Sequence, residues 1–354
     1  MSGQAGSRRL GAAVLVLGSV CVGIAAIEGI VRIAELAPRI ERIRARDRAS
    51  ALRLSENPIL GYEFRESFVG PDGFRTNALG QRDVERSVEK APGIRRIIVL
   101  GDSVVMGLHL ALGQTITQQL EALLADRRVE ALNFGIQGYC TQAEVELLRI
   151  RGLRLSPDLV VVVFLRNDHR NFNGDIVRNL ERPRPAWAEQ LFVRSHLFRF
   201  VSLRLDLFHL RSELDPDYDR RWNEAAVDDD NVESGLATLA RLSREHGFGT
   251  LVAVWPSFAR DGILDPAGLF EDEAQRRMKV ESIAARHNIP TARLSERFRA
   301  DYARRVARGE VRGGRPSPRD LYADDGMHPN AFGAETAARI LLALIEERGL
   351  LPAQ

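Results

Sequence analysis

The sequence predicts an α/β domain built on a parallel sheet, preceded by an apolar helix long enough to cross a membrane. From residue 97 onward, short apolar runs alternate with amphipathic helical patterns, which is typical of repeated strand-helix units. An almost uncharged run at residues 10–27 predicts the N-terminal helix. With 354 residues, 28% of them charged and 45% hydrophobic, the chain has the composition of an ordinary globular protein.

The apolar run at residues 10–27 predicts a single-pass N-terminal membrane anchor. Arg9 precedes this run and Glu28 follows it. A helix rises about 1.5 Å per residue, so a span needs roughly 17–25 apolar residues. A cleaved signal peptide is the alternative, but apolar residues continue past Glu28 and no small-residue cleavage site precedes a polar stretch. We therefore expect residues 1–39 to form an uncleaved anchor.

The orientation of this anchor is open to two interpretations. Several arginines follow the span, namely Arg32, Arg39, Arg42, Arg44, Arg46 and Arg48. The positive-inside rule then favours a cytoplasmic location for the rest of the chain. Against this rule, we expect the domain after the anchor to lie on the periplasmic or extracytoplasmic side.

The chain after the anchor is expected to fall into a lead-in and one large domain. Residues 40–90 predict a stalk and lead-in, because an Arg-rich stretch is followed by a segment rich in Gly and Pro. Residues 91–354 predict the α/β domain. Its strands are expected at residues 97–100, 129–133, 159–164, 250–254 and 290–294, and its helices at 114–125, 141–153, 232–245, 273–286 and 331–347.

Two segments do not fit this alternation, at residues 166–231 and 299–320. The first contains enough apolar residues for a helical insertion. We expect it either to pack against the core or to form a lid over the ligand-binding edge of the sheet.

Charge and cysteine content exclude several classes of function. The net charge of +2 is spread along the chain rather than gathered in one basic face, so no nucleic-acid partner is expected. The only cysteines are Cys21 and Cys140, which form neither a disulfide framework nor a thiolate metal site.

The strongest local signal is a buried-type strand at residues 97–100 that runs directly into Gly101, Asp102 and Ser103. In open α/β sheets, ligands bind at the carboxyl ends of the strands, so Ser103 is placed where a nucleophile is useful. Ser and Asp are also common in turns and helix caps, and this motif alone is weak.

A serine needs a base to accept its proton, and a carboxylate to orient that base. Asp325 and His328 lie three residues apart in a loop before the last helix. One turn of chain brings the carboxylate of Asp325 against the imidazole of His328. The alternative is that these residues are turn residues in solvent. The other histidines considered, His109, His169, His196 and His209, are interpreted as surface or packing residues.

Acyl transfer also needs hydrogen-bond donors for the developing oxyanion. Gly138 follows the strand at 129–133 in a turn, where its N–H can face a substrate without a side chain in the way. Asn167 follows the strand at 159–164 and carries a side-chain amide. Both would meet Ser103 at one edge of the sheet.

Taken together, Gly-Asp-Ser, Asn-x-Gly-x-x-Gly, Asn-Asp after a strand and Asp-x-x-His resemble the GDSL/SGNH hydrolase family in order and context. The resemblance implies a flavodoxin-like three-layer sandwich with neither metal nor cofactor. It makes Ser103 the nucleophile and an oxyanion donor, with Gly138 and Asn167 as the other donors. His328 becomes the base, with Asp325 as its partner, while Asp102 supports the loop.

Two further features bear on the resemblance. The family's third block usually begins with glycine, whereas Leu165 stands two residues before Asn167 here. Residues 57–62 and 74–82 resemble the lead-in of membrane-tethered bacterial members.

The expected activity is hydrolysis of an O-acyl ester, first of all an O-acetyl ester, on a small molecule or saccharide. An O-acyltransferase that modifies an envelope polysaccharide would use the same residues. A catalytically silent binding module of the same fold is the alternative from another class, and the full set of reactive residues argues against it.

Overall fold

The structure is a computed structural model that describes residues 2–40, 51–70, 73–169, 174–181, 184–214, 230–258, 271–311 and 321–351. The chain divides into two compact units. The first comprises Met1–Asp47 and Arg178–Asp219, and the second comprises Arg48–Val177 and Arg220–Gln354. Each unit is described by itself.

The second unit is built on a parallel sheet of five strands in the order β4-β3-β5-β6-β7. The strands are β3 (Arg95–Gly101), β4 (Val129–Gly135), β5 (Leu159–Phe164), β6 (Gly249–Val254) and β7 (Thr291–Arg293). Counted within the sheet, this is the order 2-1-3-4-5 of flavodoxin-like folds. The predicted α/β fold with a parallel sheet is confirmed, and each expected strand agrees with the structure to within two residues at either end.

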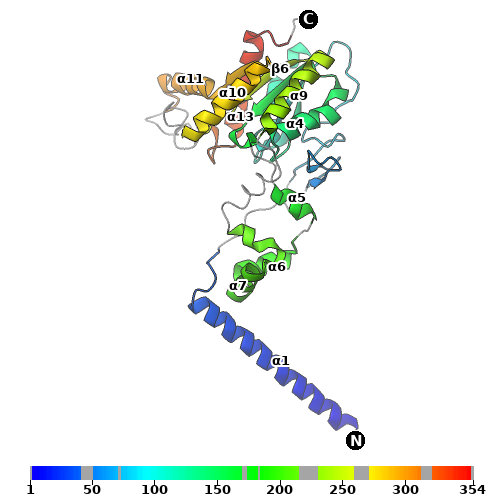
Figure 1. The fold of residues 1–354 in the computed structure, drawn as a ribbon, viewed down its shortest axis with the longest axis vertical. Helices are drawn as coiled ribbons and strands as arrows, with labels where there is room; N and C mark the ends of the chain where they lie inside the picture. Colours follow the sequence, from blue (N-terminus) through cyan, green and yellow to red (C-terminus); the bar gives the residue numbers. More distant parts are fainter. Residues whose placement is uncertain are drawn as a thin grey trace. The chain divides into compact units, whose positions relative to one another are not determined.

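Helices cover both faces of this sheet because successive strand residues point to opposite sides. On one face Ile97 and Val99 share a core with α3 (Ile116–Leu123), α11 (Leu294–Ala307) and α13 (Ala331–Glu347). The other helices of the unit include α4 (Thr141–Leu147), α9 (Asn231–His246) and α10 (Glu271–Arg286). Helix α9 packs against α4, α10 and strand β6, and α4 packs against β3 and β4 (Figure 1).

Two helices differ from the expected pattern. The helix expected at residues 141–153 ends as an α-helix at Leu147 and continues through a π-turn, Leu148–Gly152, into a 3-10 turn, Leu153–Leu155. The segment expected to be an insertion at 299–320 begins inside α11, whose Phe298 and Tyr302 are buried in the core. That part is therefore a layer helix, while residues 312–320 lie outside the described residues.

The lead-in forms a small antiparallel hairpin of β1 (Leu52–Leu54) and β2 (Tyr62–Phe64). Tyr62 and Phe64 are almost fully buried. The lead-in is thus part of the packed domain from residue 51 onward. Residues 41–50, which belong to the expected stalk, lie outside the part of the chain that the structure describes.

The first unit contains the long helix α1 (Ser2–Ile33) and two shorter helices, α6 (Ala186–Arg194) and α7 (His196–Leu205). Helix α5 (Gly174–Glu181) crosses the division between the units. Within α1, Val14–Ile33 is long and apolar enough to cross a membrane, with a mean hydropathy of 2.4. Such a helix near the N-terminus fits either an anchor or a signal sequence.

Candidate active site

Ser103 is the first residue of the short helix α2 (Ser103–Met106), which follows β3 with only Asp102 between them. Asp102 caps this helix, because its Oδ1 accepts a hydrogen bond from the N–H of Val104 at 3.0 Å. A Cβ added to Gly135 would lie 2.1 Å from the backbone nitrogen of Met106. Glycine at the end of β4 therefore allows α2 to pack directly on the sheet.

The structure brings Ser103 close to Asp325 and His328, although they lie more than 220 residues apart in the sequence. The Oγ of Ser103 lies 2.8 Å from Nε2 of His328, and the Nδ1 of His328 lies 2.6 Å from Oδ2 of Asp325. The side chains form one hydrogen-bonded chain from serine to carboxylate. This is the geometry that activates a serine for attack on a carbonyl.

The loop that carries His328 holds Asp325 in its ionised form. Burial raises the pKa of this carboxyl, but hydrogen bonds from the His328 ring and from the N–H groups of Met327 and His328 outweigh it, so that the pKa lies below its usual value. Those N–H groups donate to Oδ1 at 2.9 and 2.7 Å. A carboxylate fixed in this way keeps a proton on Nδ1 of His328 and leaves Nε2 free to accept one.

The three predicted oxyanion donors follow the neighbouring strands β3, β4 and β5. Gly138 has a φ of +76°, a conformation that glycine adopts without strain. The Nδ2 of Asn167 donates to Oδ2 of Asp102 at 2.9 Å, and no acceptor for its second hydrogen is found among the described residues. Among the described residues, no acceptor is recorded for the N–H of Ser103 or of Gly138.

Leucine at position 165 is accommodated without strain. Leu165 is buried in the core, and it is not among the described residues with a positive φ. Its N–H donates to Oδ2 of Asp168 at 2.8 Å, and its carbonyl accepts from the N–H of Asp168 at 2.9 Å. This closed turn fixes the backbone on either side of Asn167.

Comparison with protein families decides the identity of this domain. The model of the GDSL-like lipase/acylhydrolase family matches residues 99–336, which is more than half of the chain. The chain belongs to the GDSL-like lipase/acylhydrolase family. It is therefore an acylhydrolase-type hydrolase, and the expected family is confirmed. No curated protein matches the sequence.

Solved structures of hydrolases and esterases resemble this one at low sequence identity. A lipase/acylhydrolase from Enterococcus faecalis is 18% identical over 74% of this chain and 100% of its own, with a TM-score of 0.41. The α/β hydrolase LAE5 from a metagenome of Lake Arreo, Spain, is 17% identical over 75% of this chain and 99% of its own, with a TM-score of 0.43. A psychrotrophic esterase, EstA from a Pseudoalteromonas species, is 12% identical over 72% of this chain and 98% of its own, with a TM-score of 0.40.

The lead-in of this acylhydrolase supports the helix that begins at Ser103, which the sequence alone did not indicate. Arg82 is buried, and its guanidinium donates to the carbonyls of Met106, Gly107 and Leu110, the first of them at 2.8 Å. These carbonyls lie at and after the C-terminal end of α2, where a cation is favourable. Arg82 is the last residue of the 74–82 stretch that resembles family members.

The lead-in also supports the turn that carries Gly138. The hydroxyl of Tyr62 donates to the carbonyl of Gln137 at 2.7 Å, and the hydroxyl of Tyr139 donates back to the carbonyl of Tyr62. The two rings pack edge to face at 5.3 Å. The hairpin therefore holds the residues on either side of Gly138 in place.

Two further residues lie near His328 or its loop. The indole N–H of Trp255 donates to the carbonyl of Met327 at 2.9 Å and so ties the His328 loop to the end of β6. The ring of His109, interpreted above as a surface or packing residue, lies 6.2 Å from the ring of His328 in an edge-on arrangement. No sequence signal links residues this far apart in the chain.

Three buried acidic side chains lie behind the candidate site. Burial raises the pKa of Asp102, of Glu144 and of Asp168, and their mutual repulsion adds to the effect on Glu144 and Asp168. Both carboxyl oxygens of Glu144 lack a hydrogen-bond partner among the described residues. Asp168 accepts from the N–H of Leu165, so Glu144 is the member of the cluster that favours the protonated form.

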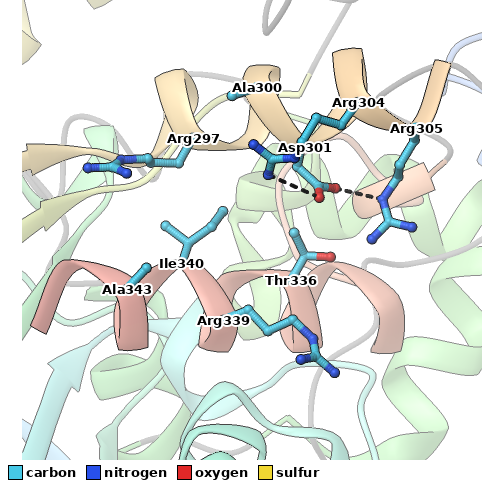
Figure 2. Close-up of a pocket in the computed structure, with 9 residues that line it drawn as sticks. All are labelled: Arg297, Ala300, Asp301, Arg304, Arg305, Thr336, Arg339, Ile340 and Ala343. Atoms are coloured by element: carbon cyan, nitrogen blue, oxygen red, sulfur yellow. Dashed lines mark hydrogen bonds and ion pairs between the residues drawn. The ribbon is translucent and has the colours of Figure 1, made fainter. Parts of the chain in front are cut away.

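A pocket elsewhere in the domain contains none of the predicted site residues. Figure 2 shows it between α11 and α13, where Asp301 pairs with Arg305 at 2.7 Å and with Arg304 at 3.6 Å. The other two lining arginines pair with glutamates. Of these pairs, Arg297–Glu347 joins α11 to α13, whereas the others lie within one helix.

Proposed function

We propose that this protein is a serine ester hydrolase in which Ser103 is the nucleophile, His328 the general base and Asp325 its orienting partner. The observation that carries the proposal is the hydrogen-bonded chain from Ser103 Oγ through the His328 ring to Asp325. Its distances of 2.8 and 2.6 Å lie within the range that proton transfer requires.

The reaction follows from this arrangement in two steps. Nε2 of His328 accepts the hydroxyl proton as Ser103 Oγ attacks the ester carbonyl, and the same proton then goes to the departing alkoxide. The alcohol leaves and an acyl group remains on Oγ. In the second step a water molecule gives its proton to His328 and attacks the acyl carbon, which releases the acid and restores the Ser103 hydroxyl.

The oxyanion of each tetrahedral intermediate is stabilised by the N–H groups of Ser103 and Gly138 and by the amide of Asn167. The positive φ of Gly138 supports this assignment, as does the second hydrogen on Nδ2 of Asn167, which has no acceptor within the described part of the chain. Because Asp102 and the Leu165 turn fix Asn167 in advance, its amide reorients little as charge develops.

The proposed substrate is an O-acyl ester on a small molecule or saccharide, with acetyl as the first acyl group to test. We also propose that Val14–Ile33 anchors the protein in a membrane, with the hydrolase domain on the extracytoplasmic side. The length and hydropathy of this segment support the anchor.

Hydrolysis of a p-nitrophenyl acetate by the full-length protein in detergent tests the chemistry. We expect Ser103→Ala to abolish turnover while the protein melts normally, and a fluorophosphonate probe to label Ser103 only when His328 is present. Ser282→Ala is the matched control, because Ser282 is exposed on α10 and donates only to the carbonyl of Lys279. Turnover by Ser103→Ala at the wild-type rate would remove the proposal.

A further inference from the structure

The helical pair α6 and α7 is attached to the apolar helix α1 within the first unit. The carboxylate of Glu28 accepts the N–H of His196 on Oε1 at 2.8 Å. Its Oε2 accepts the N–H of Leu197 and the hydroxyl of Ser195, each at 2.8 Å. Glu28 thus provides the acceptors at the start of α7, where backbone N–H groups have no partner within the helix and a negative charge is favourable.

Helix α7 also contacts the turn that follows α1. Arg199 of α7 is almost completely buried. Its guanidinium donates to the carbonyl of Phe192 in α6 and to the carbonyl of Pro38 after α1, each at 2.7 Å. Val31 and Ala37 are buried as well. The end of α1 and the turn after it are therefore structural parts of the unit that holds α6 and α7.

This attachment argues that α1 is retained in the working protein. A signal peptidase cut after Glu28 would remove the acceptor of three hydrogen bonds, and a cut after Pro38 would also expose α7 around Arg199. No other described residue of this unit would then accept the hydrogen bonds that Glu28 accepts or cover the surface that α1 and the turn after it bury.

The attachment also sets the depth of α7 relative to a membrane. Glu28 lies five residues before Ile33, the end of the apolar span. At about 1.5 Å per residue, the start of α7 lies roughly 7–8 Å along α1 from the end of that span, and this fixes its depth when α1 crosses a membrane as proposed. A carboxylate at this depth is costly unless it is paired, and the N–H groups of α7 supply the pairing.

The outer surface of α6 and α7 has the composition of a membrane-interface element. Trp187 is 54% exposed and packs its ring on Phe198 and Phe208, and Leu205 is 67% exposed. Trp187 therefore lies beside the first turn of α7. Tryptophan is enriched at the level of lipid headgroups. Exposed arginines lie in the same unit, at Arg32, Arg39, Arg194, Arg204 and Arg211.

We propose that α6 and α7 lie in the interface of a lipid bilayer, held there by Glu28 of an uncleaved α1. Trp187, Leu205 and Leu191, which is 42% exposed, contact the upper acyl chains, and the exposed arginines bind anionic headgroups. The inference rests on the proposal that α1 is an anchor and is independent of the ester chemistry.

The test uses the full-length protein in vesicles of phosphatidylethanolamine and phosphatidylglycerol, with bromine on the acyl chains either near the headgroup or near the bilayer centre. We expect the shallow bromine to quench tryptophan fluorescence more than the deep one. This quenched component should be absent in Trp187→Phe. Intact mass should show that the chain retains the residues before Glu28.

A matched pair of variants tests the role of Glu28. Glu28→Gln replaces one acceptor oxygen with a donor, so we expect the shallow quenching of Trp187 to fall at least twofold while the protein stays in the membrane fraction. Glu35→Gln, at an exposed residue whose ion-pair partner within the described residues is Arg39, should leave the quenching unchanged.

Three results would overturn the proposal. A mature N-terminus beyond Glu28 would show that α1 is a signal peptide. Equal fluorescence in brominated and plain vesicles would place α6 and α7 in water or against another protein copy. Unchanged quenching in Glu28→Gln would show that Glu28 does not hold the pair at the membrane. None of these readouts depends on hydrolysis, so each is separable from a failure of the Ser103 mechanism.

Discussion

Ser103 lies in the packed interior of the domain, whereas Asp325 and His328 lie in a surface loop, although the three side chains form one hydrogen-bonded chain. Ser103 is 9% exposed, while the Asp325 side chain is 46% exposed. The surroundings of Ser103 are fixed by Arg82, Asp102 and the glycine at the end of β4. The His328 loop is held by contacts from Asp325, Trp255 and the helix cap of α13.

This difference shows how the two sides of the site can be separated by experiment. The nucleophile side is rigid because the domain core and the lead-in surround it, so substitutions of the residues that support Ser103, such as Arg82, are expected to affect both stability and rate. The base side depends on polar contacts within one loop, so substitutions there are expected to affect the rate with little loss of stability.

After Ser103→Ala, the largest effect should come from Asp325→Asn. An amide holds His328 in the wrong tautomer while the fold is unchanged, and turnover is expected to fall by about 10⁴. Asp324→Asn is the control, because Asp324 contacts Asn330 instead of the imidazole. Steady-state rates and thermal melting would check this, and a loss below about tenfold with normal melting would contradict the orienting role of Asp325.

Asn167→Ala tests the donor on the nucleophile side. Loss of one oxyanion donor is expected to lower turnover by about 10²–10³ with little change in KM. Asn57→Ala is a matched control, since its amide donates to Glu146 and not toward Ser103. The neighbouring Asp168→Ala would be a poor control, because Asp168 is buried and accepts a hydrogen bond from the N–H of Leu165. A loss smaller than about tenfold would mean that the N–H groups of Ser103 and Gly138 stabilise the oxyanion without Asn167.

Arg82→Met tests whether the lead-in positions the nucleophile. Losing the guanidinium leaves carbonyls after α2 without their donor, so the free energy of unfolding should fall by about 2–3 kcal/mol. Turnover per active site should fall by about tenfold, and KM should stay within about twofold. Active sites would be counted with the fluorophosphonate probe. If the number of active sites falls but the rate per site does not, Arg82 is structural only.

The smallest effect should be on stability, from Glu144→Gln. The pKa of Glu144 is raised in the folded protein, whereas in the unfolded chain a glutamate has a pKa of about 4.3. Above that pH the unfolded chain loses the Glu144 proton while the folded protein keeps it. The free energy of unfolding therefore falls as pH rises, by about 1.4 kcal/mol per pH unit at most. Removing this group should therefore raise the stability at pH 8 relative to that at pH 5 by at least about 1 kcal/mol. Chemical denaturation of the wild type and the variant at the two pH values would check this. If the two proteins differ in free energy of unfolding by the same amount at pH 5 and at pH 8, Glu144 is not protonated in the folded protein.

The sequence by itself determined the sheet and its order of elements, because period and length carry that information. The strand at 159–164 is a run of apolar residues that is buried along its whole length, and the expected range matches β5. The last helix, at 331–347, also matches α13, where Asn330 caps the first turn through its Oδ1 to the N–H of Gly333. Local propensity and the apolar pattern agree in both elements.

The sequence also indicated which residues the domain brings to one edge, from Ser103 at the end of β3 to Asn167 after β5. It did not indicate what holds them there. The contacts of Arg82 with the carbonyls after α2, and of Trp255 with Met327, join residues 24 to 72 positions apart. Such pairs leave no periodic signal, because each depends on how separate elements pack.

Only the tertiary structure decided how the insertion is attached. The apolar residues of α6 and α7 suggested either core packing or a lid, and neither interpretation included α1. Glu28 reads in the sequence as the polar end of an apolar run, but in the structure it is the acceptor for the first N–H groups of α7, 168 residues away in the chain. A single carboxylate gives no sign of a distant partner, because only the fold determines which helix N-terminus reaches it.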